Sequence, residues 1–302
     1  MNSEIIETKI NRTKQRIQLR DKRHLGFAEY GPRDGYPIVY CPGSQSSRLE
    51  MHYDLSFTIT HQLRIIAVDR PGHGMSDFNP KGSILEFARD IKELMGFLKI
   101  DRFSVAAMSA GAPFAFGIVY KIPEKINQMA IVSGFAPLTK HNKKALSRKI
   151  KLMLGVSKSF PKFFALLLRF QAKQIAKNPE KVLQSFLKMM NDSDKKILEN
   201  PAVIKVLQNM FTEAYRNGSK GVAYEISKIL VKDWGFDYSK TQVPISFWQG
   251  EKDNNVPYEW AEFMANQIER SSLKTYPNHG HLLIFDHAEE IFSSLKDPVS
   301  LN

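Results

Sequence analysis

The sequence predicts an α/β protein whose mostly parallel sheet carries helices on both faces and is interrupted by an all-helical insertion. Short apolar runs that end at Pro or Gly alternate with helical periodicity over residues 38–132 and again over residues 244–296. Such runs are typical of strands buried on both faces of a parallel sheet. In between, the strand signal stops and apolar residues recur only at helical spacing. The predicted organisation is a core of residues 1–137 and 235–302 with a helical insertion of residues 138–234.

The first half of the core is expected to open with a hairpin and to continue with strands and helices in turn. Polar and apolar residues alternate over Gln15–Arg20 and His24–Tyr30 around a turn, which predicts an antiparallel hairpin. Ser83–Leu98 carries its apolar residues on one helical stripe, and Ala110–Tyr120 is also predicted as a helix. The remaining apolar runs predict buried strands at Ile38–Cys41, Ile65–Val68, Phe103–Met108 and Ala130–Val132.

The second half of the core repeats this alternation after the insertion. Strand-like sequence resumes at Pro244–Gln249 and again at Leu273–Tyr276. Helices are predicted at Glu259–Arg270 and Ala288–Lys296. No internal repeat and no low-complexity linker interrupts the chain.

Glycine and proline divide the insertion into several predicted helices. Proline favours the first turn of a helix and glycine favours its end, so both mark expected boundaries. Asp192 or Ser193 is expected to cap a short helix that ends before Asn200. Boundaries are predicted at Gly155, Pro161, Pro179, Pro201 and Gly218.

The positive charge of the chain is concentrated in this insertion. The 302 residues include 43 Lys and Arg against 31 Asp and Glu, which gives a formal net charge of +12. Fifteen of the bases and three of the acids lie between Pro137 and Lys196, so this segment alone carries the whole excess. A basic surface attracts nucleic acid, anionic lipid or an acidic partner, and it also occurs as a solvated lysine-rich helical face. Because no nucleic-acid-binding motif accompanies it, an anionic lipid or an acidic partner is the candidate and nucleic acid is not expected.

Composition predicts a soluble globular protein. Hydrophobic residues make up 43% of the chain and charged residues 25%, the balance of a folded domain. No run approaches the ~20 apolar residues that span a bilayer, and Met1–Arg20 lacks the apolar core of a secretory signal. The single cysteine, Cys41, excludes an intramolecular disulfide and a cysteine-rich zinc site. We therefore expect a reduced, cytoplasmic protein.

A serine stands at a predicted turn between a strand and a helix. The segment is Ala107-Met108-Ser109-Ala110-Gly111, and Ser109 directly follows the predicted strand. A serine on such a sharp turn projects its hydroxyl into an open site, and small residues two positions before and after it let the backbone segments approach. Ala107 stands where glycine is usual and is the least bulky replacement. Ser109 is the candidate nucleophile, and an ordinary helix N-cap is the alternative role.

An acid and a base follow the last two predicted strands. Asp253 lies in the loop after Pro244–Gln249, where it is suited to orient a histidine and to stabilise the imidazolium formed during proton transfer. His281 follows Leu273–Tyr276 and is suited to take the serine proton and return it to the leaving group. The alternative for Asp253 is to cap a turn. The chain order Ser109, Asp253, His281 matches the order of nucleophile, acid and base in α/β-hydrolases.

With these motifs the chain resembles the α/β-hydrolase superfamily, in particular bacterial serine hydrolases with a helical cap. The resemblance covers roughly Gly26 to Phe292. It implies an eight-stranded, mostly parallel sheet and a cap (lid) formed by residues 138–234. Four further segments carry it, namely Asp69–Ser76 at the turn before the nucleophile helix, Gly250–Pro257 at the acid loop, Gly280–Leu282 at the histidine loop, and Trp234–Phe236 where the insertion rejoins the core.

The resemblance also implies an oxyanion hole made of two backbone amides. One is the amide of Ala110, directly after the candidate nucleophile, and the other is the amide of Ser44 in the loop after Ile38–Cys41. Each donor is worth about 3 kcal/mol to the transition state. The family usually has a histidine where this chain has Pro42, a departure that bears on the packing of the loop.

Nearby residues compete for the base and acid roles. His279 lies two residues before His281, but the spacing of the family favours His281 and leaves His279 at the rim. The position that holds the acid in some members offers Ser133-Gly134 and no carboxylate. Asp286 is expected to lie on the surface or to cap a helix.

The leading functional hypothesis is a serine hydrolase that cleaves carboxylic esters through an acyl-enzyme. The alternatives are a ligand-binding or signalling protein that keeps the pocket, a carbon–carbon bond hydrolase, and a perhydrolase. Serine at position 109 argues against the related epoxide and haloalkane hydrolases, which use an aspartate nucleophile. No phosphate-binding loop, metal-ligand pair or nicotinamide fingerprint stands out, so neither a cofactor nor a metal is expected.

Substrate contacts are expected from an apolar segment of the insertion. Residues Phe160–Phe170 are hydrophobic nearly all round, which suits either a pocket lining or packing within the insertion. Phe160, Phe163 and Phe164 are the candidate substrate-binding residues. Together with the flanking lysines, this segment makes an acyl chain or an anionic lipid surface a secondary hypothesis.

Overall fold

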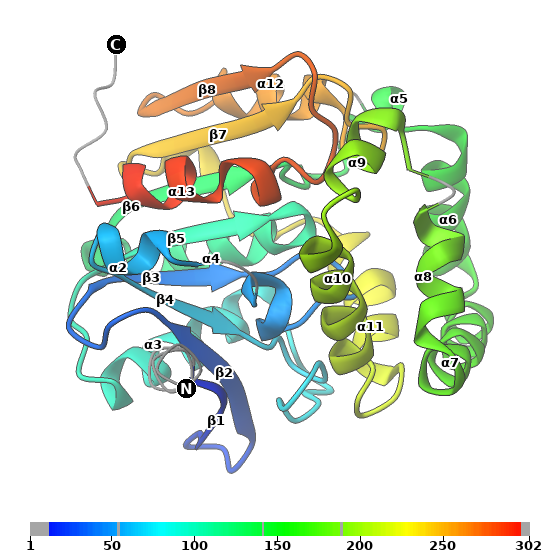
Figure 1. Ribbon diagram of the computed structural model, residues 1–302, viewed down its shortest axis with the longest axis horizontal. Coiled ribbons are helices and arrows are strands. Elements are labelled where there is room, and N and C mark those ends of the chain that lie inside the picture. Colours follow the sequence, from blue (N-terminus) through cyan, green and yellow to red (C-terminus); the bar gives the residue numbers. More distant parts are fainter. Residues whose placement is uncertain (1–11, 53–54, 141, 188–189, 297–302) are drawn as a thin grey trace.

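An eight-stranded sheet forms the centre of the molecule, with the strand order β1-β2-β4-β3-β5-β6-β7-β8 (Figure 1). The computed structural model describes residues 12–52, 55–140, 142–187 and 190–296. β1 and β2 pair antiparallel, β2 pairs antiparallel with β4, and all the other neighbours are parallel. The predicted hairpin and the mostly parallel sheet are confirmed. The strands are β1 (Arg12–Gln18), β2 (His24–Tyr30), β3 (Tyr36–Cys41), β4 (Leu63–Val68), β5 (Phe103–Met108), β6 (Ile126–Val132), β7 (Ile245–Gly250) and β8 (Ser271–Tyr276).

Alternate residues of the central strands enter two different hydrophobic cores, one on each face of the sheet. Val39 and Ile66 belong to the first core, whereas their neighbours Ile38 and Ile65 belong to the second. Both faces are therefore buried, as the continuous apolar runs predict. The first core is closed by α3 (Ile84–Phe97), α4 (Ala112–Lys121) and α12 (Tyr258–Ala265), and the second by α2 (Phe57–Thr60) and α13 (Ile284–Ser294).

Two core helices differ in length from the sequence prediction. α12 ends at Ala265 instead of Arg270, because the Ser271 hydroxyl donates to the Ala265 carbonyl oxygen at 2.8 Å and closes the helix end. α13 begins at Ile284, one turn before the predicted start. Its residue His287 has non-helical dihedral angles, φ −119° and ψ 18°, and this kink separates the first turn from the periodic pattern that follows.

Between β6 and β7 the residues that the structure describes form helices and no strand, and these helices lie beside the carboxyl ends of the central strands (Figure 1). Pro161, Pro179 and Pro201 begin α7, α8 and α10 as predicted. Gly155 does not end a helix but lies inside α6, because a glycine costs only about 1 kcal/mol there and the buried Leu154 and Ser157 anchor the turn around it. The helices are α5 (Asn142–Ala145), α6 (Arg148–Ser159), α7 (Pro161–Lys177), α8 (Pro179–Leu187), α9 (Asp192–Ile197), α10 (Pro201–Ala214), α11 (Lys220–Tyr224) and the π-helix η4 (Glu225–Leu230).

The cap of α9 is one residue earlier than predicted. Asn191, and neither Asp192 nor Ser193, is the N-cap, and its side-chain oxygen accepts the Asp194 amide at 2.8 Å. Asp192 is exposed at the start of the helix, whereas the side chain of Asp194 is buried. The sequence prediction of this cap was therefore wrong. The buried carboxylate of Asp194 does not cap α9 and instead accepts the backbone amide of Leu282.

One inserted helix packs on the core with its backbone. Gly72, in the loop after β4, has a left-handed φ of +82° that favours glycine. A Cβ atom at Gly72 would lie 2.6 Å from the Cα of Gly221 in α11, and one at Gly221 would lie 2.4 Å from the Gly72 carbonyl oxygen. Neither position has room for a side chain, so these two glycines let α11 approach the core directly.

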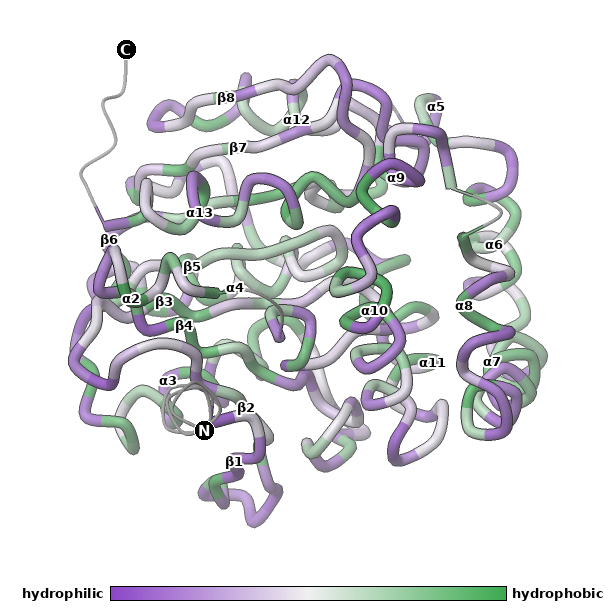
Figure 2. Tube along the Cα trace, viewed as in Figure 1, coloured by the Kyte–Doolittle hydropathy of each residue, from purple (hydrophilic) through white to green (hydrophobic). Residues whose placement is uncertain are grey.

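Hydrophilic and hydrophobic residues alternate along the inserted helices (Figure 2). This pattern fits helices that bury one side and expose the other. Within the described segments, each helix is too short or too polar to cross a membrane.

Candidate active site

Loops at the carboxyl ends of three strands bring Ser109, Asp253 and His281 to one cavity. All three residues line a cavity of about 1250 Å³ between the sheet and the inserted helices. Ser109 follows β5, Asp253 follows β7 and His281 follows β8. Because the carboxyl ends of parallel strands meet at one edge of a sheet, residues far apart in sequence converge there.

Ser109 occupies a sharp turn between β5 and α4. Its φ is +50°, in the left-handed region that costs a residue with a side chain roughly 1–2 kcal/mol. The turn is held by the Phe135 amide, which donates to the Ser109 carbonyl oxygen at 2.9 Å. Gly111 completes it, because a Cβ there would lie 2.1 Å from the Cys41 carbonyl oxygen. Ala107 is fully buried in β5, where its register partners are Cys41 and Ile131, so the sheet accommodates its methyl group.

Asp253 and His281 form a direct contact. The His281 Nδ1 and the Asp253 Oδ2 are 2.8 Å apart, and the carboxylate can only accept, so Nδ1 carries the proton. The Asp253 side chain is fully buried. Its Oδ1 accepts the amides of Asn255 and Val256 at 2.8 and 2.9 Å, which fixes the carboxylate in the loop.

The charges around His281 favour its protonated form. Burial disfavours the imidazolium of His281, but the charge and the hydrogen bond of Asp253 outweigh burial and raise the pKa of His281 above its ordinary value. The carboxylates of Asp194 and Glu50 add to this rise. The Ser133 hydroxyl donates to the His281 carbonyl oxygen at 3.3 Å, so the loop after β6 supports the histidine loop without supplying an acid.

The loop after β3 presents Ser44 to the same cavity. Ser44 and Ala110 both line it, as does the side chain of Glu50. The Gly43 amide donates to Glu50 at 3.0 Å and is therefore occupied within the protein. Burial raises the pKa of Glu50, although hydrogen bonds from Tyr40 and Gly43 act in the opposite direction. This arrangement leaves Ser44, and not Gly43, as the loop residue suited to supply an amide to a ligand.

Arg70 holds this loop through the loop's backbone carbonyl oxygens. Its buried guanidinium donates to the carbonyl oxygens of Pro42 and Gly43 and forms a two-point contact with the carboxylate of Glu225. It also lies 5.1 Å from the ring centre of Phe114. Since Glu225 begins the π-helix η4, the inserted helices contribute directly to the shape of the loop that contains Ser44.

A second link joins the same loop to the insertion. Gln45 has a left-handed φ of +55° and lines the cavity. Its side-chain oxygen accepts hydrogen bonds from the Tyr215 hydroxyl at 2.5 Å and from the Gln171 amide group at 3.0 Å. The loop is therefore fixed by two separate sets of contacts with the inserted helices.

Asp194 is a site residue that the sequence analysis missed. It lies in α9 with 1% of its surface exposed, and its Oδ1 accepts the Leu282 amide at 2.8 Å, directly after His281. A Cβ at Gly280 would lie 2.6 Å from both Asp194 carboxylate oxygens, so the glycine is required at this contact. Asn191 adds a hydrogen bond to the Lys252 carbonyl oxygen at 2.7 Å. The one signal in the sequence is that Asp194 is one of only three acids in a strongly basic segment.

The structure separates His279 and Asp286 from the Asp253 contact. His279 lies 3.4 Å from Asp286, which is in the first turn of α13, and 3.2 Å from the ring of His287. Both residues are partly exposed. His281 is therefore the histidine that meets the buried carboxylate.

The expected substrate contacts of Phe160, Phe163 and Phe164 are not found. Phe160 and Phe163 are exposed on the outside of the insertion, and Phe164 is buried in the first hydrophobic core. A helix that is apolar on all sides carries no sequence signal for which side points inward, and this explains the error. Most of the described inserted residues that line the cavity lie instead on α6, α10 and η4, among them Ile150, Met153, Leu207, Met210 and Ile226.

The described residues contain no group of three or more His, Cys, Asp or Glu side chains arranged to hold a metal ion. The polar residues that line the cavity include Ser109, His281 and Asp253, beside other polar side chains such as Gln45, Glu50, Lys149 and Asn254. This donor set is suited to proton transfer and to stabilising an anion.

Comparison with known proteins relates the chain to one family. The model of the family described as alpha/beta hydrolase fold matches residues 36–288. A non-heme chloroperoxidase from Streptomyces lividans is 25% identical over 276 residues, which cover 89% of this chain and 93% of that protein. A bifunctional esterase/perhydrolase from Acinetobacter calcoaceticus is 22% identical over 285 residues, which cover 92% and 97%.

Solved structures share the fold at lower sequence identity. An esterase from Exiguobacterium antarcticum superposes with a TM-score of 0.71 at 19% identity, over 94% of this chain and all of that chain. An enol-lactonase from Burkholderia xenovorans superposes with a TM-score of 0.69 at 16% identity, over 94% and 98%. At these identities the likeness concerns the architecture of sheet and helices.

Proposed function

Because the chain belongs to the α/β-hydrolase family, we propose that it is a serine hydrolase that cleaves carboxylic esters through an acyl-enzyme. The proposal depends on one observation. The His281 Nδ1 and the Asp253 Oδ2 are 2.8 Å apart, and both residues line the cavity that Ser109 also lines. Relatives named as an esterase/perhydrolase and as chloroperoxidases lend support at the level of the family.

The three side chains would divide the chemistry as follows. The Ser109 hydroxyl attacks the ester carbonyl carbon while His281 takes its proton, and the buried Asp253 stabilises the resulting imidazolium. The imidazolium then protonates the departing alkoxide, which leaves an acyl group on Ser109. A water molecule, deprotonated by His281, then attacks the acyl carbon. The bond between the acyl carbon and the Ser109 Oγ breaks, the imidazolium returns the proton to that oxygen, and the carboxylic acid leaves.

The developing oxyanion would be bound by backbone amides. We assign this role to the amides of Ser44 and Ala110, each worth about 3 kcal/mol in the transition state. The support is positional: both residues line the cavity, and the neighbouring Gly43 amide is already taken by Glu50. Arg70, through the carbonyl oxygens of Pro42 and Gly43, would hold the loop in the required orientation.

The inserted helices would act as a cap over the site. We assign residues 1–137 and 235–302 to the catalytic core and residues 138–234 to the cap. Support comes from the cavity wall, to which α6, α10 and η4 contribute apolar side chains. An apolar wall of this kind suits the acyl part of an ester more than a charged substrate.

The named relatives favour perhydrolysis as a second candidate activity. Hydrogen peroxide in place of water would attack the acyl carbon and lose a proton to His281. The bond to the Ser109 Oγ would then break, the imidazolium would return the proton to that oxygen, and the peroxy acid would leave. The observation in its favour is the bifunctional esterase/perhydrolase among the relatives. Peroxy-acid formation from an ester and hydrogen peroxide, measured beside ester hydrolysis, distinguishes the two.

Labelling with a fluorophosphonate probe tests the proposal. Wild type is expected to be labelled and Ser109→Ala is not, whereas Ser185→Ala, a change at an exposed serine of α8, should be labelled normally. Hydrolysis of p-nitrophenyl esters of increasing chain length would then define the acyl preference. If folded wild type reacts with neither the probe nor the esters, the chain is a binding protein that keeps the hydrolase pocket.

A further inference from the structure

The outer surface of α6 and α7 is unusually apolar. Among the described residues ten large apolar side chains are exposed, and seven of these lie between residues 152 and 170. Two of them, Phe160 and Phe163, are residues that the sequence predicted to contact the substrate. Exposed apolar side chains gathered in this way mark a contact surface. Six are between 47% and 69% exposed: Leu152, Phe160, Phe163, Leu166, Leu167 and Phe170.

Four of these side chains form one stripe on α7, and Phe160, the residue that precedes the helix, lies at its start. At 100° per residue the four fall within an arc of about 100°, and we call Phe160, Phe163, Leu166, Leu167 and Phe170 the α7 stripe. The opposite part of the helix points inward, where Phe164, Leu168 and Ile175 are buried. The stripe is bordered on one side by exposed cations, Lys162, Arg169 and Lys173.

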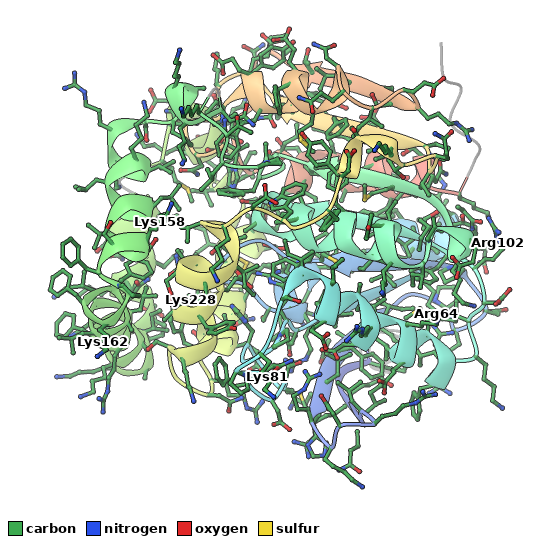
Figure 3. All side chains as sticks on the ribbon, turned by 180° about the vertical axis from the view of Figure 1, so that it is seen from behind. Arg64, Lys81, Arg102, Lys158, Lys162 and Lys228 are labelled. Carbon is green, nitrogen blue, oxygen red and sulfur yellow. The ribbon has the colours of Figure 1, made fainter. Side chains whose placement is uncertain are left out.

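The charge around the stripe is almost entirely positive. Between Lys140 and Lys181 the chain has twelve Lys and Arg residues and one acid, Glu180. Figure 3 shows Lys158 and Lys162 on these helices, at the end of the molecule away from the core residues Arg64 and Arg102. Figure 1 shows α7 at the same outer edge, with α10 and α11 between it and the sheet.

We propose that the α7 stripe and its surrounding lysines dock on an anionic lipid bilayer. A helix with aromatic and leucine side chains on one face and lysines beside them inserts its apolar face at the boundary between head groups and acyl chains. The lysines then lie among anionic head groups, and each strengthens partition about fivefold. A second copy of the chain is a poorer occupant, because it would bring two strongly basic surfaces together.

The docking surface adjoins the cavity. Helix α6 packs against α7, exposes Leu152 and lines the cavity with Ile150, Met153 and Leu154. Met153 both lines the cavity and is exposed, so the cavity reaches the surface at this helix. Docking would place that opening at the bilayer. If the proposed hydrolase function holds, on which this step rests, the substrates are esters with acyl chains that partition into lipid.

Co-flotation of the full-length protein with lipid vesicles tests the docking. Vesicles of phosphatidylcholine alone are compared with vesicles of equal parts phosphatidylcholine and phosphatidylglycerol, each at low and high salt. Wild type is expected to float with the anionic vesicles at low salt and to be released at high salt. Phe163→Ser with Phe170→Ser should weaken partition on the order of tenfold. Separately, Lys162→Gln with Lys173→Gln should weaken it about 25-fold, about fivefold for each lysine.

Matched changes elsewhere serve as controls. Phe97→Ser alters a phenylalanine of α3 that is as exposed as Phe170, at 64%, and Lys81→Gln with Lys121→Gln removes two exposed core charges. Both controls should float like wild type. Because the substitutions are on the outside, hydrolysis of soluble p-nitrophenyl acetate should stay unchanged in all of them, and Ser109→Ala should still dock.

Three results would overturn the proposal. They are equal recovery of wild type with neutral and anionic vesicles, normal flotation of both double variants, and a solution dimer that the phenylalanine changes convert to a monomer. The last would identify a second copy as the occupant. If wild type docks but hydrolyses no ester, the hydrolase proposal is refuted and the docking proposal still holds.

Discussion

At the scale of single residues, the hydrogen bond between Asp253 and His281 sets the protonation state of the candidate base. Only neutral His281 can accept the serine proton. Because Asp253 raises the pKa of His281 above the ordinary 6.5, kcat/KM should fall as the pH drops through a value higher than 6.5. Activity is therefore expected on the alkaline side of that value.

Asp253→Asn tests this assignment. Removing the carboxylate takes away the largest effect that raises the pKa of His281, so the acid limb of the pH profile should move to lower pH. The rate should fall by about 10⁴-fold, because the imidazolium loses its partner. The measurement is kcat/KM for a p-nitrophenyl ester across pH. An unchanged acid limb would show that another group controls it.

Asp194 is a positioning residue by its geometry, since it holds the amide beside His281 rather than a reacting atom. Asp194→Asn removes a charge that helps to raise the pKa of His281 and weakens the hold on the Leu282 amide. We expect a loss in kcat on the order of 10²-fold and an acid limb shifted to lower pH.

The control for Asp194 is its exposed neighbour. Asp192→Asn changes a carboxylate of the same helix that pairs only with the exposed Lys195 among the described residues, and it should leave both rate and pH profile as in wild type. If Asp194→Asn lowers the melting temperature without moving the pH profile, its role is purely structural.

At the scale of elements, the π-helix η4 stabilises the loop that contains Ser44 through one buried ion pair, between Glu225 and Arg70. Glu225→Gln would leave the guanidinium of Arg70 buried without its counter-charge, which costs about 3–5 kcal/mol in the free energy of unfolding. Urea unfolding measures this loss. Where the variant folds, kcat should fall more than KM rises, because the loop that presents Ser44 is loosened. Glu262→Gln, on the exposed side of α12, is the matched control.

The sequence predicted those elements whose signals are local. Strands appear as apolar runs because both faces of the sheet are buried, and Pro161, Pro179 and Pro201 mark helix starts because proline fits the first turn. The predicted helix end at Gly155 was wrong, because the free-energy cost of a glycine inside a helix is small compared with the packing around it. The kink at His287 hid the first turn of α13 for a similar reason: tertiary contacts decided it.

The candidate site could be predicted only in part for the same physical reason. Ser109, Asp253 and His281 stand in recognisable motifs at strand ends, and the structure brings all three to one cavity. Asp194 and Glu225 meet their partners across 88 and 155 residues of chain. Such contacts depend on how the inserted helices sit on the core, and no local pattern encodes them.

At the scale of the whole molecule, helices α7 and α10 of the insertion bury different numbers of side chains. The 17-residue α7 buries three side chains, whereas the 14-residue α10 buries five and pairs Glu213 with the buried Arg48 of the core. Elements with fewer buried contacts open more readily. Amide hydrogen exchange should therefore be faster in α7 than in α10, with α4 of the core slowest. Equal protection of α7 and α10 would contradict this.

The contact between Gly72 and Gly221 makes the insertion a part that cannot be exchanged alone. A cap transplanted from a relative would bring its own residue to position 221, and any side chain there would strike the Gly72 carbonyl oxygen. A chimera should fold only when glycine is kept at both position 72 of the core and position 221 of the insertion. Diversification of the cap, in nature or by design, is therefore free along the outer helices and constrained at α11.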